Sequence, residues 1–111
     1  MSLSVTSESK GEATVVGVGG DLDVYTAPRL KETLEEAMAG SSRLVLDLSS
    51  VQFIDSTALG VLVGALQHAQ SNGCDFRLVM DDPFLLKIFR ITGFDGMFSI
   101  HAQLEDAVSV S

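Results

Sequence analysis

The sequence predicts an α/β fold: a small mixed, largely parallel sheet flanked by about four helices. Short apolar segments with the character of strands alternate along the chain with segments whose apolar residues recur at helical spacing. Only the first two strand-like segments follow each other directly, across a Lys10-Gly11 turn that is typical of a hairpin. A hairpin followed by strand–helix alternation favours a largely parallel sheet covered by helices, and it leaves the order of the strands open.

No linker, repeat or low-complexity segment interrupts this pattern, so the 111 residues are expected to form one domain, 1–111, with its core at about 4–110. In chain order, the expected elements are a strand at 5–9, a strand at 13–18, a loop at 19–23, a helix that starts at Thr26 and stops at Gly40, a strand at 43–48, a helix at 57–72, a strand at 75–80, a helix from Asp82 to Gly93, a strand at 97–100 and a helix at 103–110.

The ends of the helices and the apolar content of the strands justify these assignments. Thr26 and Asp82 are favoured cap residues, and each is followed by a proline in the first turn. A glycine ends each of the three longer helices. The nearly continuous apolar run 43–48 is typical of a strand that is covered on both faces.

Composition and charge exclude several classes of partner. Fifteen acidic residues against seven scattered basic ones give a net charge of −8. This balance disfavours nucleic acid and direct contact with an anionic membrane, and it favours a partner with a basic protein surface. The longest apolar run, 58–66, falls short of the ~20 residues that span a bilayer. The single cysteine, Cys74, and the lack of a signal-like N-terminus predict a cytoplasmic protein.

The segment 44–60 holds the main candidate site. It is expected to form a buried strand, a short loop and a helix start that carries Asp55, Ser56 and Thr57. A serine at this place can be a helix cap, a nucleophile or a phosphate acceptor. Capping by Asp55 or Ser56 would stabilise the helix by about 1 kcal/mol, and it is compatible with a further function of the hydroxyl.

The nucleophile interpretation is disfavoured, because no histidine is placed to serve Ser56 as a base. His68 lies twelve residues further along the same expected helix, about 18 Å away at 1.5 Å per residue. His101 has no evident orienting partner. Ile54 and Ala58 occupy the positions where the nucleophile turn of a hydrolase has glycines. No catalytic residue is therefore assigned.

No metal site and no cofactor are expected. Two histidines and one cysteine lack the paired spacing of metal ligands. The glycine run 17–20 follows a strand but does not open a helix promptly, and no Gly-Lys-Ser/Thr phosphate-binding motif occurs. The run is therefore interpreted as a flexible strand end.

Two further features are candidates for partner contact. Loops that follow parallel strands gather at one edge of the sheet, so Asp21 and Asp23 are expected beside Ser56 on an acidic, glycine-containing surface. Gly60 and Gly64 lie four residues apart and hence on one face of the helix, at a cost of about 1 kcal/mol each relative to alanine. Two interpretations stay open for this pair: close packing against the domain's own sheet, or a groove open to a partner.

Four motifs stand out: Gly20-Asp21-Leu22-Asp23, Leu46-Asp47-Leu48, Phe53-Ile54-Asp55-Ser56-Thr57-Ala58-Leu59-Gly60 and Ile91-Thr92-Gly93-Phe94. Together they resemble the anti-sigma factor antagonist family, whose fold is called the STAS domain. The resemblance runs from about Ser4 to Val110, and Asp-Ser-Thr-x-Leu-Gly is its most specific part. Where many members of the family carry a glycine, this chain has Ala58.

The resemblance implies a bacterial switch protein with a small sheet flanked by helices, and not an enzyme. Its unphosphorylated form would bind an anti-sigma factor, often a serine kinase, and so free a sigma factor. Phosphorylation at Ser56, with Thr57 as the alternative hydroxyl, would break the complex, and a metal-dependent serine phosphatase would restore it. The residues expected to contact the partner are Asp21, Asp23, Asp55, Ser56, Thr57, Ala58, Leu59, Gly60 and Gly64.

Two other functions stay open beside the switch. One is a scaffold of the same fold that is not phosphorylated, such as a subunit of a lipid-transport system or a stress-signalling assembly. The other is a small enzyme or ligand-binding module, which lacks a base and a cofactor motif here. The presence of both hydroxyls and of Asp55 favours the switch.

Overall fold

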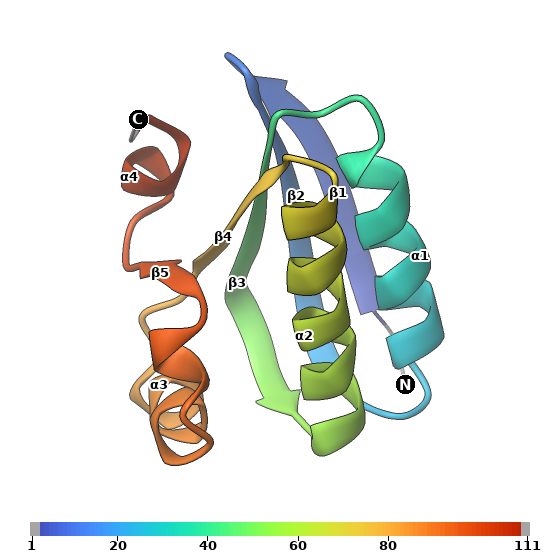
Figure 1. Ribbon diagram of the computed structural model, residues 1–111. Helices are drawn as coiled ribbons and strands as arrows, with labels where there is room; N and C mark the ends of the chain where they lie inside the picture. The colour runs from blue at the N-terminus through green and yellow to red at the C-terminus, as the bar shows by residue number, and fades with distance from the viewer. Residues whose placement is uncertain (1–2, 110–111) are drawn as a thin grey trace.

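A five-stranded sheet in the order β1-β2-β3-β4-β5 forms the centre of the structure, a computed structural model that describes residues 3–109 (Figure 1). The elements are β1 (Leu3–Lys10), β2 (Ala13–Leu22), α1 (Ala27–Met38), β3 (Arg43–Ile54), α2 (Ser56–Ser71), β4 (Asp75–Val79), α3 (Pro83–Ile91), the 3-10 turn η1 (Phe94–Gly96), β5 (Ser99–His101) and α4 (Leu104–Ser109). Strand β1 is antiparallel to β2, and all other neighbours are parallel. The predicted fold class, a mixed and largely parallel sheet with four helices, is confirmed.

Helices connect each pair of neighbouring parallel strands. The chain passes from β2 to β3 through α1, from β3 to β4 through α2, and from β4 to β5 through α3 and η1. Parallel strands that are joined in this way have their carboxyl ends at the same edge of the sheet. The loops that follow β2 and β3 therefore meet at one edge, which is where Ser56 lies.

Two apolar clusters hold the helices on opposite faces of the sheet. Helices α1 and α2 lie side by side on one face (Figure 1), and α3 contributes to the same large cluster. Side chains in this cluster with no exposed surface include Leu30, Leu34, Leu46, Leu62, Leu78 and Phe89. The smaller cluster lies beneath α4 and joins Ala107 to Val15, Val45 and Val79. Strand β3 is thus covered on both faces, as its apolar run predicts.

The structure corrects the predicted ends of β2 and β3. Both strands run on, to Leu22 and Ile54, where the sequence predicts loops at 19–23 and 49–56. Pairing of the two strands continues past the glycines by means of two register shifts, and Gly20 takes a φ of 100°, which favours glycine. The glycine run is therefore part of a paired strand and not a flexible strand end.

Smaller differences concern the ends of other elements. Helix α2 starts at Ser56. The last strand is 99–101 instead of 97–100, because the N–H groups of Met97 and Phe98 donate back to the Phe94 carbonyl of the unpredicted turn η1. Thr26 precedes α1, but its hydroxyl caps no helical N–H. Asp82 caps α3 as predicted and accepts a hydrogen bond of 2.9 Å from the Phe84 N–H. The expected helix end at Val110 lies outside the described residues.

Two arginines from the sheet hold the last turn of α4. Arg77 Nη1 donates to the Ala107 carbonyl at 3.1 Å, and Arg43 Nη1 donates to the Val108 carbonyl at 2.8 Å. Arg77 also donates to Asp75 through Nη2 and Nε, at 2.7 and 3.2 Å. This hydrogen bonding by Arg77 is the main reason that the pKa of the Asp75 carboxyl lies below its ordinary value, with the positive charges of Arg77 and Arg43 adding to it and partial burial opposing it.

We expect Asp75→Asn to remove a pH-dependent contribution to the free energy of unfolding. Because the folded pKa of Asp75 is lowered, its contribution is fully present above the unfolded pKa of about 3.9 and is lost as the pH falls through the folded value. The difference in free energy of unfolding between wild type and Asp75→Asn should be roughly 1 kcal/mol at neutral pH, since the carboxylate is partly exposed. Urea unfolding between about pH 2 and pH 7 measures this difference.

The difference should shrink below about pH 4. Asp81→Asn, which removes an exposed negative charge on the loop before α3, controls for the change in net charge. A stability difference that stays constant down to about pH 2 would contradict the role given to the Asp75 carboxylate.

Candidate functional site

The Ser56 hydroxyl is carried by the first residue of α2, and Asp55 caps that helix. Asp55 has an extended backbone, with φ −108° and ψ 178°, which ends β3 and turns the chain into the helix. Its Oδ1 accepts a hydrogen bond of 3.0 Å from the Ala58 N–H. Of the two predicted cap residues, Asp55 is therefore the cap, and Ser56 is left exposed at the positive end of a 16-residue helix.

The loop between β2 and α1 is held by Asp23 and Thr26, both of which are buried. Asp23 Oδ1 accepts from the N–H groups of Tyr25 and Thr26, at 2.9 and 3.0 Å. Thr26 Oγ1 accepts from the Asp23 N–H at 2.9 Å and donates to the Asp21 carbonyl at 2.9 Å. The Asp23 carboxylate is thus used to shape the loop, and it is not part of a solvated acidic turn.

The loops after β2 and β3 lie side by side, as predicted. The Asp55 N–H donates to the Leu22 carbonyl at 3.0 Å, and the Val24 N–H donates to Asp55 Oδ2 at 3.1 Å. Three large apolar residues at this junction face solvent: Val24 and Tyr25 on the loop after β2, with exposed fractions of 53% and 79%, and Phe53 near the end of β3, with 45%. We call Val24, Tyr25, Phe53, Ser56 and Thr57 the Ser56 surface.

The apolar members of the Ser56 surface are not among the residues that the sequence predicts. Val24, Tyr25 and Phe53 look like ordinary apolar positions in the sequence, and only the fold shows that they are exposed. Ala58 and Leu59, by contrast, are expected to contact a partner but belong to the core, with exposed fractions of 0% and 7%. They pack the start of α2 against the domain and form no part of the Ser56 surface.

The histidines lie away from Ser56. His68 is on the fourth turn of α2, about 18 Å from the helix start at 1.5 Å per residue. His68 therefore lies too far along α2 to act as a base for Ser56. His101 lies on β5, where its Nε2 is 2.9 Å from the Ser99 hydroxyl.

Among residues 3–109 no group of three or more His, Cys, Asp or Glu side chains could hold a metal ion. Within the same range, no helix has both the length and the apolar character needed to cross a membrane.

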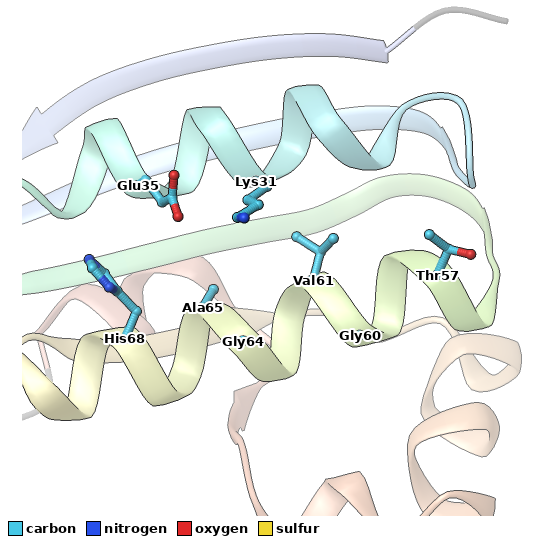
Figure 2. Close-up of a pocket in the computed structure, with 8 residues that line it drawn as sticks. All are labelled: Lys31, Glu35, Thr57, Gly60, Val61, Gly64, Ala65 and His68. Carbon is cyan, nitrogen blue, oxygen red and sulfur yellow. The ribbon is translucent and has the colours of Figure 1, made fainter.

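A groove of about 490 Å³ separates α1 from α2 and begins beside Thr57 (Figure 2). Its α2 side is formed by Thr57, Gly60, Val61, Gly64, Ala65 and His68, and its α1 side by Lys31 and Glu35. Both glycines are exposed, and a Cβ atom at either position would meet no atom within 4 Å. The domain's own packing therefore does not require these glycines, and the open-groove interpretation of Gly60 and Gly64 is the one that fits the structure.

We expect Gly60→Ala and Gly64→Ala each to raise the free energy of unfolding by about 0.5–1 kcal/mol, because alanine is the better helix former and the groove has room for it. Gly19→Ala is the opposite case. Its Cβ would lie 2.8 Å from Ser4 Oγ and 3.1 Å from Ser50 Cβ, so it should destabilise by about 1–3 kcal/mol. Urea unfolding of the three variants measures the expected gain in stability at Gly60 and Gly64 and the expected loss at Gly19. A loss of stability in Gly60→Ala would mean that the groove is closed in solution.

Comparison with known proteins places this geometry in a family. The family model described as "STAS domain" matches residues 4–107. The anti-sigma-B factor antagonist of Bacillus subtilis (strain 168) is 32% identical over 108 residues, which cover 97% of this chain and 99% of that one.

Solved structures agree with this match. An anti-sigma factor antagonist from Mycobacterium paratuberculosis superimposes with a TM-score of 0.88 at 29% identity, covering 97% of this chain and 92% of that one. The Bacillus cell fate determinant SpoIIAA in its phosphorylated form shares the fold, with a TM-score of 0.71 at 18% identity over 95% of this chain and 96% of that one. The chain thus belongs to the anti-sigma factor antagonist family of STAS domain proteins.

Proposed function

We propose that this protein is an anti-sigma factor antagonist whose unphosphorylated form binds an anti-sigma factor with serine kinase activity and thereby releases a sigma factor. One observation carries the proposal: an exposed serine starts a capped helix at the junction of two loops, next to three exposed large apolar side chains. Exposed apolar residues grouped on one surface mark sites of protein–protein interaction. The names of the matching relatives supply the class of partner.

Ser56 is proposed as the phosphate acceptor, with Thr57 as the less favoured hydroxyl. A phosphate on Ser56 would add about −1.5 to −2 charges at a helix N-terminus, where free N–H groups and the helix dipole favour an anion. The modification should therefore leave the domain folded. In a complex, the same phosphate would be buried within the interface beside the Asp55 carboxylate, and a buried charge that is left unpaired is costly. Phosphorylation is thus proposed to block docking, and a metal-dependent serine phosphatase to restore it.

The proposed partner contacts are five of the predicted residues, all of which face solvent or the groove: Asp21, Ser56, Thr57, Gly60 and Gly64. The two carboxylate oxygens of Asp55, also a predicted contact, accept hydrogen bonds from N–H groups of the domain itself. The groove adjoins the Ser56 surface at Thr57, so one partner could cover both. With a net charge of −8, the chain should attract a partner that presents basic residues. The relatives' role in sigma factor regulation supports a cytoplasmic place of action.

Phosphate transfer provides the direct test. The purified protein is incubated with its cognate anti-sigma kinase and ATP, and its intact mass is measured. We expect a single added phosphate in wild type and in Thr57→Ala, and none in Ser56→Ala. Stoichiometric labelling of Ser56→Ala would show that the acceptor has been assigned to the wrong residue.

A further inference from the structure

We infer that Asp55 is a positioning residue, which holds the loop between β2 and α1 against the start of α2, and that Tyr25 on this loop is the anchor of partner binding. This inference rests on the proposed function and adds to it how the Ser56 surface is assembled. Tyr25 is a residue that neither the sequence motifs nor the family resemblance singles out.

Asp55 joins the two loops through its side chain and its backbone. Its Oδ1 accepts from the Ala58 N–H inside α2, and its Oδ2 accepts from the Val24 N–H of the other loop. The Asp55 N–H completes the junction by donating to the Leu22 carbonyl. One carboxylate therefore bonds two N–H groups that lie more than thirty residues apart in the chain.

The second carboxylate oxygen explains why an aspartate stands at this cap. Serine, threonine and asparagine also cap helices, but each offers only one acceptor oxygen in its side chain. Here the cap uses Oδ1, which leaves Oδ2 for Val24. Asparagine at position 55 can keep the cap, but its amide nitrogen cannot accept from the Val24 N–H.

The backbone that carries Tyr25 is bonded at three successive residues. The Val24 N–H is held by Asp55, and the N–H groups of Tyr25 and Thr26 are held by Asp23. On this fixed backbone Tyr25 is the most exposed of the large apolar residues between positions 3 and 109, at 79%. Tyrosine is enriched among residues that dominate binding energy, and a pre-ordered anchor loses less entropy when it binds.

A double-mutant cycle tests the coupling between Asp55 and Tyr25. Binding of the cognate anti-sigma factor is measured by calorimetry for wild type, Asp55→Asn, Tyr25→Ala and the double variant. We expect a loss of affinity of about thirty-fold for Tyr25→Ala and about ten-fold for Asp55→Asn. The double variant should be within about three-fold of Tyr25→Ala, because Asp55 would act only through the loop that carries the ring.

Amide hydrogen exchange supplies a readout that does not depend on any partner. In Asp55→Asn the Val24 amide should exchange faster, while the Ala58 amide stays protected because the cap is kept. Asp55→Ser, which also has a single acceptor, should behave in the same way. Tyr25→Phe keeps the ring and should retain most of the affinity.

Each outcome decides between the inference and its alternatives. Losses that add up in the double variant would mean that Asp55 contacts the partner directly, and this would overturn the positioning role. Unchanged exchange of the Val24 amide would overturn it as well. If wild type fails to bind its anti-sigma factor, the proposed function and the Tyr25 anchor fall together, whereas the exchange data still decide whether Asp55 holds the loop.

Discussion

Replacement of Ser56 by aspartate is expected to weaken binding of the anti-sigma factor by at least about one hundred-fold, while the domain stays folded. The substituted carboxylate lies at the first residue of α2, where an anion is favoured in the free protein. In the complex it would be covered by the partner beside the Asp55 carboxylate, which is already occupied by two N–H groups. An unpaired charge buried in an interface costs several kcal/mol, which accounts for the size of the effect.

Calorimetric titration against the anti-sigma factor measures this loss of affinity, and thermal unfolding checks the fold. Gln70→Asp is a matched control, because it adds the same charge to an exposed position near the other end of α2. We expect Gln70→Asp and Ser56→Ala to bind within a few-fold of wild type. Binding of Ser56→Asp that equals that of Ser56→Ala would favour a scaffold of the same fold that is not switched by phosphorylation.

Phe89→Ala is expected to lower the free energy of unfolding by about 3–5 kcal/mol. Phe89 lies on α3 and is fully buried, and its ring meets the edge of Phe98 at a centroid distance of 5.7 Å. Phe98 in turn contacts Phe76 and Phe94, with centroid distances of 6.3 and 6.4 Å. Removal of the Phe89 ring leaves a cavity beside Phe98, the central ring of this aromatic group, and weakens the packing of α3 against the sheet.

Phe84→Ala is the control for Phe89→Ala, because it removes the same ring from the same helix at a position that is 56% exposed. Its cost should stay below about 1 kcal/mol. Urea unfolding compares the two variants under one set of conditions. Equal losses of stability would contradict the packing of α3 against the sheet.

The sequence alone predicts most of the fold because its elements are marked by local signals. Apolar runs locate β3 and β4, and proline and glycine mark where α1 and α3 begin and end. The prediction fails where pairing between strands overrides local preference. Strands β2 and β3 continue through glycine and serine residues that look like loops, because each supplies the other with hydrogen bonds across the register shifts.

The candidate site likewise has a part that local sequence signals predict and a part that only the tertiary structure shows. Motif and helix signals locate Asp55, Ser56 and Thr57, since a cap and a helix start depend on neighbours in the chain. The sequence leaves two possibilities for Gly60 and Gly64, and it gives Asp23 a solvated position. Only the packing of α1 beside α2 shows that the two glycines face an open groove, and only the hydrogen bonds of its own loop explain the burial of Asp23.

By itself, then, the sequence determined the α/β class, a helix start within one residue of Ser56 and the family, because each can be recognised from short motifs and local patterns along the chain. The tertiary structure decided how β2 and β3 pair, which apolar side chains of the neighbouring segments are exposed, and that Asp55 joins two loops. These features depend on residues that are distant in the chain and meet only when the sheet forms. Exposure and hydrogen bonding across such distances have no signature in the local pattern of one sequence.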